Sequence, residues 1–182
     1  MTRDLVERAM HGDREAFGVL AERSLDRLVG TAGLILRDTD AAQDATQNAL
    51  IRAWRDLPTL RDPDRFGSWL YRLLVNSCTD LRRRQQRHAH RALAPEHAGT
   101  TIDAAQSLAE RDALAAALDR LSDEHRAVVV LHYYAGLSHP EISTAIGEPL
   151  GTVKSRLSRA VSYLRADLAA LERAPVTGEG SA

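Results

Sequence analysis

The feature that most constrains the fold is a basic amphipathic segment between Pro149 and Ala166. It contains four cationic residues and no acidic one. Its apolar residues recur at i, i+4, i+7 and i+11, a spacing that aligns them on one side of an α-helix: Val153, Leu157, Ala160 and Leu164. A helix of this kind packs its apolar side into a small core and presents its other side to an anionic partner. The other side carries Thr152, Lys154, Ser155, Arg156 and Arg159.

The preceding residues complete a helix-turn-helix pattern. Ser138-His139-Pro140-Glu141 is a capping box with proline in the first turn, where a missing N–H costs nothing. Gly147 is a natural end for this short helix. A short helix, a tight turn and a longer basic helix predict a helix-turn-helix whose second helix contacts duplex DNA. The alternative is a surface helix pair whose arginines are only solvated.

Composition favours an all-α protein. We find no convincing strand pattern, aromatic residues make up only 4%, and alanine, leucine and arginine dominate. No run is long and apolar enough to span a membrane, and no signal peptide is evident, so we expect a cytoplasmic protein without a membrane partner. The single cysteine, Cys78, fits a reducing compartment and a small core position.

The 182 residues can form two small helical domains joined by a flexible linker. Helical periodicity is lost after His88, where prolines, glycines and threonines accumulate. Leucine spacing resumes near Ser107. We therefore predict a first domain over 1–88, a linker over 89–107, the helix-turn-helix domain over 108–173 and a disordered tail over 174–182.

Capping residues and periodicity predict the helices of the first domain. Asp13 can cap a helix that runs to Leu36 and bends near its glycines, and Asp40 with Gln43 can open a helix that ends near Asp56. A loop follows over 57–63. A long helix is then expected from about Asp64 to about Arg87.

Charge is segregated along the chain, although the net charge is only −1. The stretch from Arg72 to Arg91 contains six arginines and one aspartate, whereas 38–48 contains three aspartates and no cation. Two surfaces of opposite sign indicate two different partners. The acidic helix should expose Asp44, Gln47 and Asn48. The polar side of the long helix carries Arg72, Asn76, Asp80 and Arg83, where Asn76 is either a buried amide or a specific contact.

The sequence contains no catalytic constellation. It has no nucleophile elbow, phosphate-binding glycine loop or paired-cysteine motif. The histidines at 88, 90 and 97 do not form a closed ligand set for zinc. We therefore expect no enzymatic activity, no cofactor, no metal and no small-molecule substrate.

Three stretches resemble the extracytoplasmic-function branch of bacterial sigma factors. Residues 44–54 resemble the family pattern D-x-T-Q-E-x-F-x-R-A-W, with Asn48 in place of its Glu and Leu50 in place of its Phe. Residues 66–83 resemble F-x-x-W-L-Y-R-I-x-x-N…D-x-x-R, and residues 147–160 resemble G-x-P-x-G-T-V-K-S-R-L-x-R-A. The resemblance covers about 5–88 and 108–172.

This resemblance implies an alternative sigma factor that binds core RNA polymerase and directs promoter-specific initiation. It implies that Asp44, Gln47 and Asn48 contact the polymerase. The basic helix from Pro149 would read the upstream promoter element as duplex, and an anti-sigma factor is an expected partner. The melted downstream element would be bound by Arg72, Asn76, Arg82 and Arg83.

Two other classes of function remain open at this stage. A dimeric helix-turn-helix regulator would need two half-sites, but neither the acidic surface nor the arginine-rich helix. A helical adaptor or anti-regulator without DNA contact would leave the basic helix unexplained.

Overall fold

The computed structural model describes residues 2–89 and 107–173, and all of the regular secondary structure within them is helical. The N-terminal domain, residues 2–89, consists of α1 (Thr2–Met10), α2 (Arg14–Leu36), α3 (Thr39–Asp56), the short 3₁₀ turns η1 (Leu57–Thr59) and η2 (Pro63–Arg65), and α4 (Phe66–Ala89). The C-terminal domain, residues 107–173, consists of α5 (Ser107–Arg120), α6 (Asp123–Val129), the π-helical turn η3 (Val130–Tyr134), α7 (His139–Ile146) and α8 (Leu150–Arg173). The all-α class and the two helical domains are confirmed.

Side-chain caps set the helix starts in the N-terminal domain. Asp13 accepts a hydrogen bond from the N–H of Ala16 at 3.0 Å, as predicted. The next helix begins earlier than predicted, because Asp38 rather than Asp40 caps it. Asp38 has extended backbone angles and accepts from the N–H of Ala41 at 2.9 Å. Helix α2 runs continuously through Gly30 and Gly33, near which a bend was predicted.

The core of the N-terminal domain is made by α1, α2, α3 and α4. The inward side of α3 is lined mainly by alanines, which recur every three or four residues. Their small side chains allow α3 to lie close to α2 and α4. Cys78 is buried in this core, as predicted, and burial raises the pKa of its thiol to about 12. Four alanines of α3 are fully buried in this core: Ala42, Ala45, Ala49 and Ala53.

The C-terminal domain is organised around a buried arginine. Arg126 of α6 is 1% exposed and donates to the carbonyl oxygens of Leu118 at 2.9 Å and Leu121 at 2.8 Å. Leu118 lies in the last turn of α5 and Leu121 directly follows it, and a cation near this end is favoured by the helix dipole. Arg126 therefore fixes α6 against the end of α5. Helix α6 packs on α8, and η3 packs on α7.

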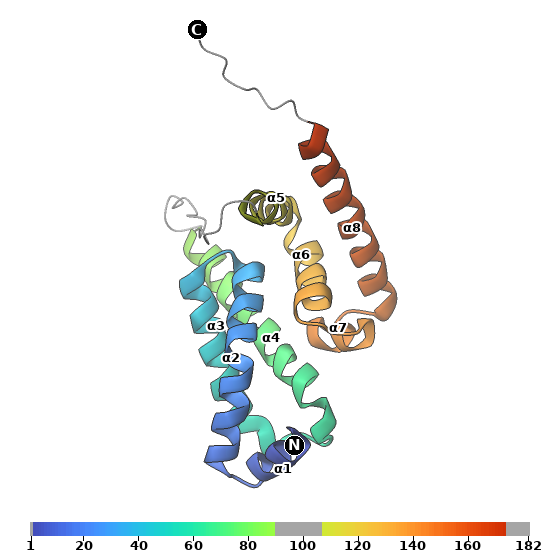
Figure 1. The fold of residues 1–182 in the computed structure, drawn as a ribbon. Helices are drawn as coiled ribbons and strands as arrows, with labels where there is room; N and C mark the ends of the chain where they lie inside the picture. Colours follow the sequence, from blue (N-terminus) through green and yellow to red (C-terminus); the bar gives the residue numbers. More distant parts are fainter. Residues whose placement is uncertain (1, 90–106, 174–182) are drawn as a thin grey trace.

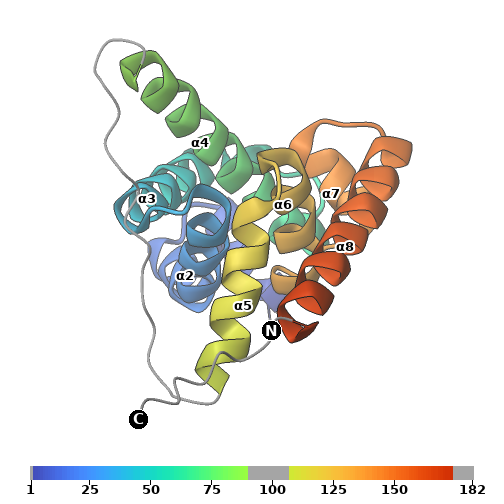
Figure 2. The ribbon, with the colours of Figure 1, turned by 90° about the horizontal axis from the view of Figure 1, so that it is seen from above.

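The two domains pack against one another along α4 (Figures 1 and 2). Helix α4 contacts α7, and α2 contacts both α6 and η3. The predicted linker and tail fall mostly on residues 90–106 and 174–182, which lie outside the described residues. None of the helices in the described ranges is both long enough and apolar enough to cross a membrane.

Candidate nucleic-acid interface

The helix-turn-helix has the predicted local geometry. The carboxylate of Glu141 accepts from the backbone N–H of Ser138 at 2.9 Å and from its hydroxyl at 2.6 Å. Gly147 ends α7 with a φ of 73°, a left-handed conformation that glycine adopts without a steric penalty. Its N–H donates to the carbonyl of Ser143, and the turn leads directly into α8.

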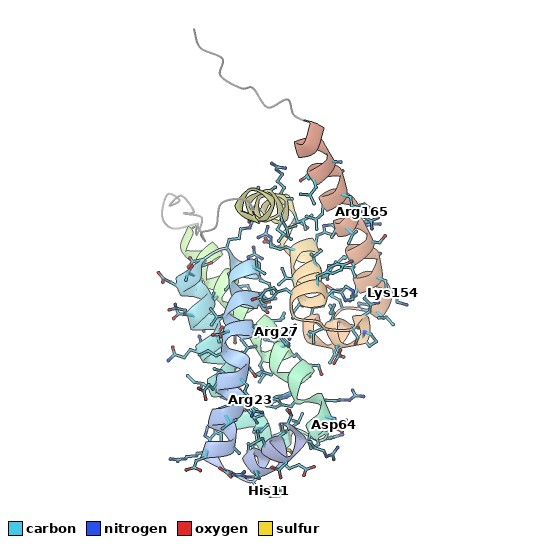
Figure 3. The ribbon with its side chains drawn as sticks, viewed as in Figure 1. His11, Arg23, Arg27, Asp64, Lys154 and Arg165 are labelled. Atoms are coloured by element: carbon cyan, nitrogen blue, oxygen red, sulfur yellow. The ribbon has the colours of Figure 1, made fainter. Side chains whose placement is uncertain are left out.

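The front of α8 presents short polar and long cationic side chains to solvent. The apolar stripe lies inward as predicted, with Val153 and Ala160 fully buried. Lys154, Ser155 and Arg159 are exposed, and Thr152 is half-buried. Lys154 and Arg165 lie along α8, on the opposite side of the molecule from α2 and α3 (Figure 3). The surface is an exposed, basic helix face, which suits contact with the major groove of DNA.

Arg156 differs from its neighbours because its side chain is only 19% exposed. Its guanidinium lies 3.0 Å from the carboxylate of Glu124 in α6 and 3.4 Å from that of Glu148 in the turn. Two carboxylates from two elements thus hold Arg156 against its own domain. The sequence predicted Arg156 as a DNA contact, and this role stays a prediction.

The polar side of α4 is exposed where the sequence placed it. Arg72, Asn76 and Arg83 are exposed, so Asn76 is not the buried amide that was one of its two interpretations. Asp80 is paired with Arg52 of α3 at 3.0 Å. Arg82 is paired with Asp123, at the start of α6 in the other domain.

A cleft of about 600 Å³ opens beside this surface, between the turn that precedes α4 and the C-terminal domain. The wall that belongs to the N-terminal domain contains three arginines, one tryptophan and an aspartate that pairs with one of the arginines at 3.4 Å: Arg61, Arg65, Arg72, Trp69 and Asp62. The ring of Trp69 is tilted against Phe66, with a centroid separation of 6.1 Å. Helix α7 supplies the opposite wall through Pro140, Glu141 and Thr144. Cationic side chains beside an aromatic ring are typical of sites that hold single-stranded nucleic acid.

A third surface lies on α3. Asp44, Gln47 and Asn48 are all exposed, and Ile51 is 59% exposed one turn farther along the same side. The surface therefore combines an acidic residue, two amides and one apolar side chain. This composition suits a basic partner helix.

Comparison with known proteins decides the family. The model of sigma-70 region 2 matches residues 20–88, and the model of sigma-70 region 4 matches residues 111–164. RNA polymerase sigma-H factor of Pseudomonas aeruginosa is 31% identical over 169 residues, which cover 86% of this chain and 88% of that protein. The ECF sigma factor SigM of Mycobacterium tuberculosis is 36% identical over 161 residues, covering 88% of this chain and 81% of SigM.

This chain belongs to the extracytoplasmic-function family of sigma factors. Proteins of this family are regulatory DNA-binding factors of transcription initiation rather than enzymes. A solved structure of CnrH in complex with the cytosolic domain of CnrY matches 93% of this sigma factor and 97% of that chain, with 30% identity and a TM-score of 0.69. The sigma factor RpoE of Bartonella quintana shares the fold, with a TM-score of 0.76 at 24% identity.

Sequence reasoning missed part of the site in this sigma factor. Arg61 lies between Pro58 and Pro63, and Arg65 follows two residues after Pro63. Neither was identified, although two arginines in or next to a proline-bounded loop were a usable signal. The acidic partners of Arg82 and Arg156 were also missed. Asp123 and Glu124 lie in α6, far along the chain from the arginines that they pair with, and Glu148 lies in the turn before α8.

Proposed function

We propose that this sigma factor binds core RNA polymerase through α3, reads the upstream promoter element as duplex with α8, and holds the downstream element as a melted strand on α4 and in the adjoining cleft. The observation that carries the proposal is the difference between the two basic surfaces. The front of α8 is the face of one helix, which exposes Lys154, Ser155 and Arg159. The second surface is a cleft with Trp69 in its wall.

A duplex and a single strand need different surfaces. A duplex offers base edges in a groove, which a protruding helix can reach. A melted strand offers the faces of unstacked bases, which an aromatic ring and cationic side chains can hold. The amide of Asn76 adds a donor and an acceptor for a base edge beside the cleft.

The test measures duplex binding and single-strand binding separately, in holoenzyme assembled from this sigma factor and core polymerase. Binding is measured to an upstream duplex and to a single-stranded downstream oligonucleotide. Trp69→Ala is expected to weaken strand binding by about 1–3 kcal/mol and to leave duplex binding unchanged. Trp69→Phe, which keeps a ring, should retain most of the affinity, and Arg159→Ala should show the opposite pattern. Equal losses of affinity for the duplex and for the single strand in every variant would contradict the assignment of the duplex to α8 and of the strand to the cleft.

An anti-sigma factor is the second proposed partner. The support is the structural match to CnrH, whose solved structure contains the cytosolic domain of CnrY. Affinity purification of the tagged sigma factor from uninduced cells, with the recovered proteins identified by mass spectrometry, tests this partner. Recovery of core polymerase alone would count against it.

A further inference from the structure

A second pocket lies on the N-terminal domain, apart from the three surfaces described above. It has a volume of about 410 Å³ and lies between α1, α2 and the start of α4, and of its lining residues only Ala135 belongs to the C-terminal domain. It shares no lining residue with the strand cleft, and none of its residues belongs to α3 or α8. A cavity of this size is typical of sites that hold small molecules.

The pocket combines an apolar floor with a cationic mouth. Its large apolar lining residues belong to the buried core of the N-terminal domain: Leu20, Leu28, Phe66 and Leu70. Its cationic lining residues are all exposed: Arg3, Arg23 and Arg27. The apolar side chains therefore lie at the bottom of the pocket, and the charges lie where it meets solvent.

Only one of the three arginines is neutralised by acidic side chains. Arg3 pairs with Asp64, which also lines the pocket, and with Glu7. Arg27 donates to a neutral group, the carbonyl oxygen of Tyr134, from Nε at 3.3 Å and from Nη2 at 3.1 Å. Within the described part of the chain, neither Arg23 nor Arg27 forms an ion pair. The pocket thus keeps an excess of positive charge.

Arg23 and Arg27 lie on successive turns of α2, so they share one side of the helix (Figure 3). Like charges at this spacing destabilise a helix. An anion bound between the two guanidinium groups would remove this repulsion. Guanidinium groups bind carboxylates and phosphates through strong charge-assisted hydrogen bonds, so these are the anionic groups that the pair suits.

Gly67 leaves space in the pocket that another residue would fill. It lines the pocket in the first turn of α4, and a Cβ atom added there would meet no atom within 4 Å. Neither a left-handed conformation nor close packing requires glycine at this position. Because glycine weakens a helix relative to alanine, its physical effect here is to keep the pocket open.

We propose that this pocket binds a small amphipathic organic anion, whose carboxylate or phosphate is held by Arg23 and Arg27 and whose apolar body lies on the leucines and Phe66. An inorganic anion would leave the apolar floor uncovered. A neutral apolar molecule would leave the two arginine charges uncompensated. The inference is independent of the roles proposed for α3, α8 and the strand cleft.

The test measures ligand binding to the full-length protein by isothermal titration calorimetry. The probes are octanoate and octyl phosphate, which carry a carboxylate or a phosphate on the same apolar chain. Acetate supplies the charge alone, and octanol supplies the chain alone. We expect saturable binding of octanoate or octyl phosphate at one site, at least about tenfold tighter than that of acetate or octanol. Absence of binding by both amphipathic probes, or equal affinity for octanol, would overturn the proposal.

Two matched pairs of variants locate the site. Arg23→Ala should weaken binding of the better probe by about tenfold or more, whereas Arg14→Ala, which removes an exposed arginine of α2 outside the pocket, should not. Gly67→Leu should abolish binding by filling the pocket, whereas Gly18→Leu adds the same side chain to α2 in open space. Melting temperatures equal to that of the wild type show that the variants are folded. Equal effects within both pairs would overturn the location.

A nucleic-acid role for the same arginines gives a different pattern. Arg23→Ala would then weaken the binding of a single-stranded oligonucleotide by the holoenzyme and leave probe binding unchanged. That result would overturn the small-molecule site. Failure of the proposed strand cleft is distinguishable from both outcomes, because it is measured with Trp69→Ala, which lies outside this pocket.

Discussion

Arg156 of α8 and Glu124 of α6 form an ion pair at 3.0 Å, which ties α8 to the body of its own domain. The arginine is mostly covered, whereas Arg159 one turn on is exposed. The two arginines of α8 therefore have different environments, and we predict a different effect for the substitution of each by alanine.

Arg159→Ala should weaken binding to the upstream duplex without changing the melting temperature. The expected loss is about 1–3 kcal/mol if Arg159 reads a base, and less if it holds a phosphate. Arg156→Ala should instead lower the stability of the C-terminal domain by about 1 kcal/mol or less, because a partly exposed ion pair is lost. Thermal melting and duplex binding by holoenzyme are measured for both variants. A large loss of duplex affinity in Arg156→Ala, with no change in melting, would show that Arg156 reads DNA directly.

Asn76→Ala should reduce open-complex formation and leave folding intact, because the side chain is exposed on α4. Open complexes are followed by permanganate reactivity of melted thymines. Gln85→Ala serves as the control, since it removes an exposed amide from the same helix. A fall in melting temperature that accounts for the loss of activity would rule out base capture by Asn76.

Reversal of charge on α3 should abolish binding to core polymerase. The variant Asp44→Lys with Gln47→Lys changes two exposed side chains, so the fold should survive. Ile51→Ala tests the apolar centre of the same surface and should weaken binding without a change of charge. Size-exclusion chromatography with core enzyme measures both, with Asp26→Lys on α2 as the control. Normal co-elution of the double variant would place the interface elsewhere.

The buried thiol of Cys78 predicts a loss of stability at alkaline pH. Burial raises its pKa from 9.0 to about 12 in the folded protein. Between these values the unfolded chain releases the thiol proton and the folded chain keeps it. The free energy of unfolding should therefore fall by about 1.4 kcal/mol per pH unit above 9 from this group alone. Urea titrations at pH 8, 9 and 10 compare the wild type with Cys78→Ala. An equal pH dependence in the two proteins would refute the effect.

Local chemistry made much of the fold predictable from the sequence. The apolar stripe of α8, the capping box at Ser138 and the stop at Gly147 each depend on residues within one or two turns. The start of α3 was placed two residues late, because Asp38 and Asp40 are both acceptable caps and only the backbone angles decide between them.

The arrangement between the domains could not be predicted in this way. Gly30 was interpreted as a place where α2 bends, whereas in the structure it receives Tyr134 from a distant turn. Arg82 was interpreted only as a DNA contact, and its pairing with Asp123 depends on how α4 meets α6. Such contacts join residues far apart in the chain, and helical periodicity carries no information about them.

We predict that this protein recognises a promoter only as part of RNA polymerase. The most direct test is a gel-shift titration on an identified promoter at physiological salt, with and without core enzyme. One helix-turn-helix per chain and a near-neutral net charge provide few duplex contacts for the protein alone. We predict weak binding by the free protein and tight, promoter-specific binding by the holoenzyme. Tight and sequence-specific binding by a dimer of the free protein would contradict the account and favour an ordinary helix-turn-helix regulator.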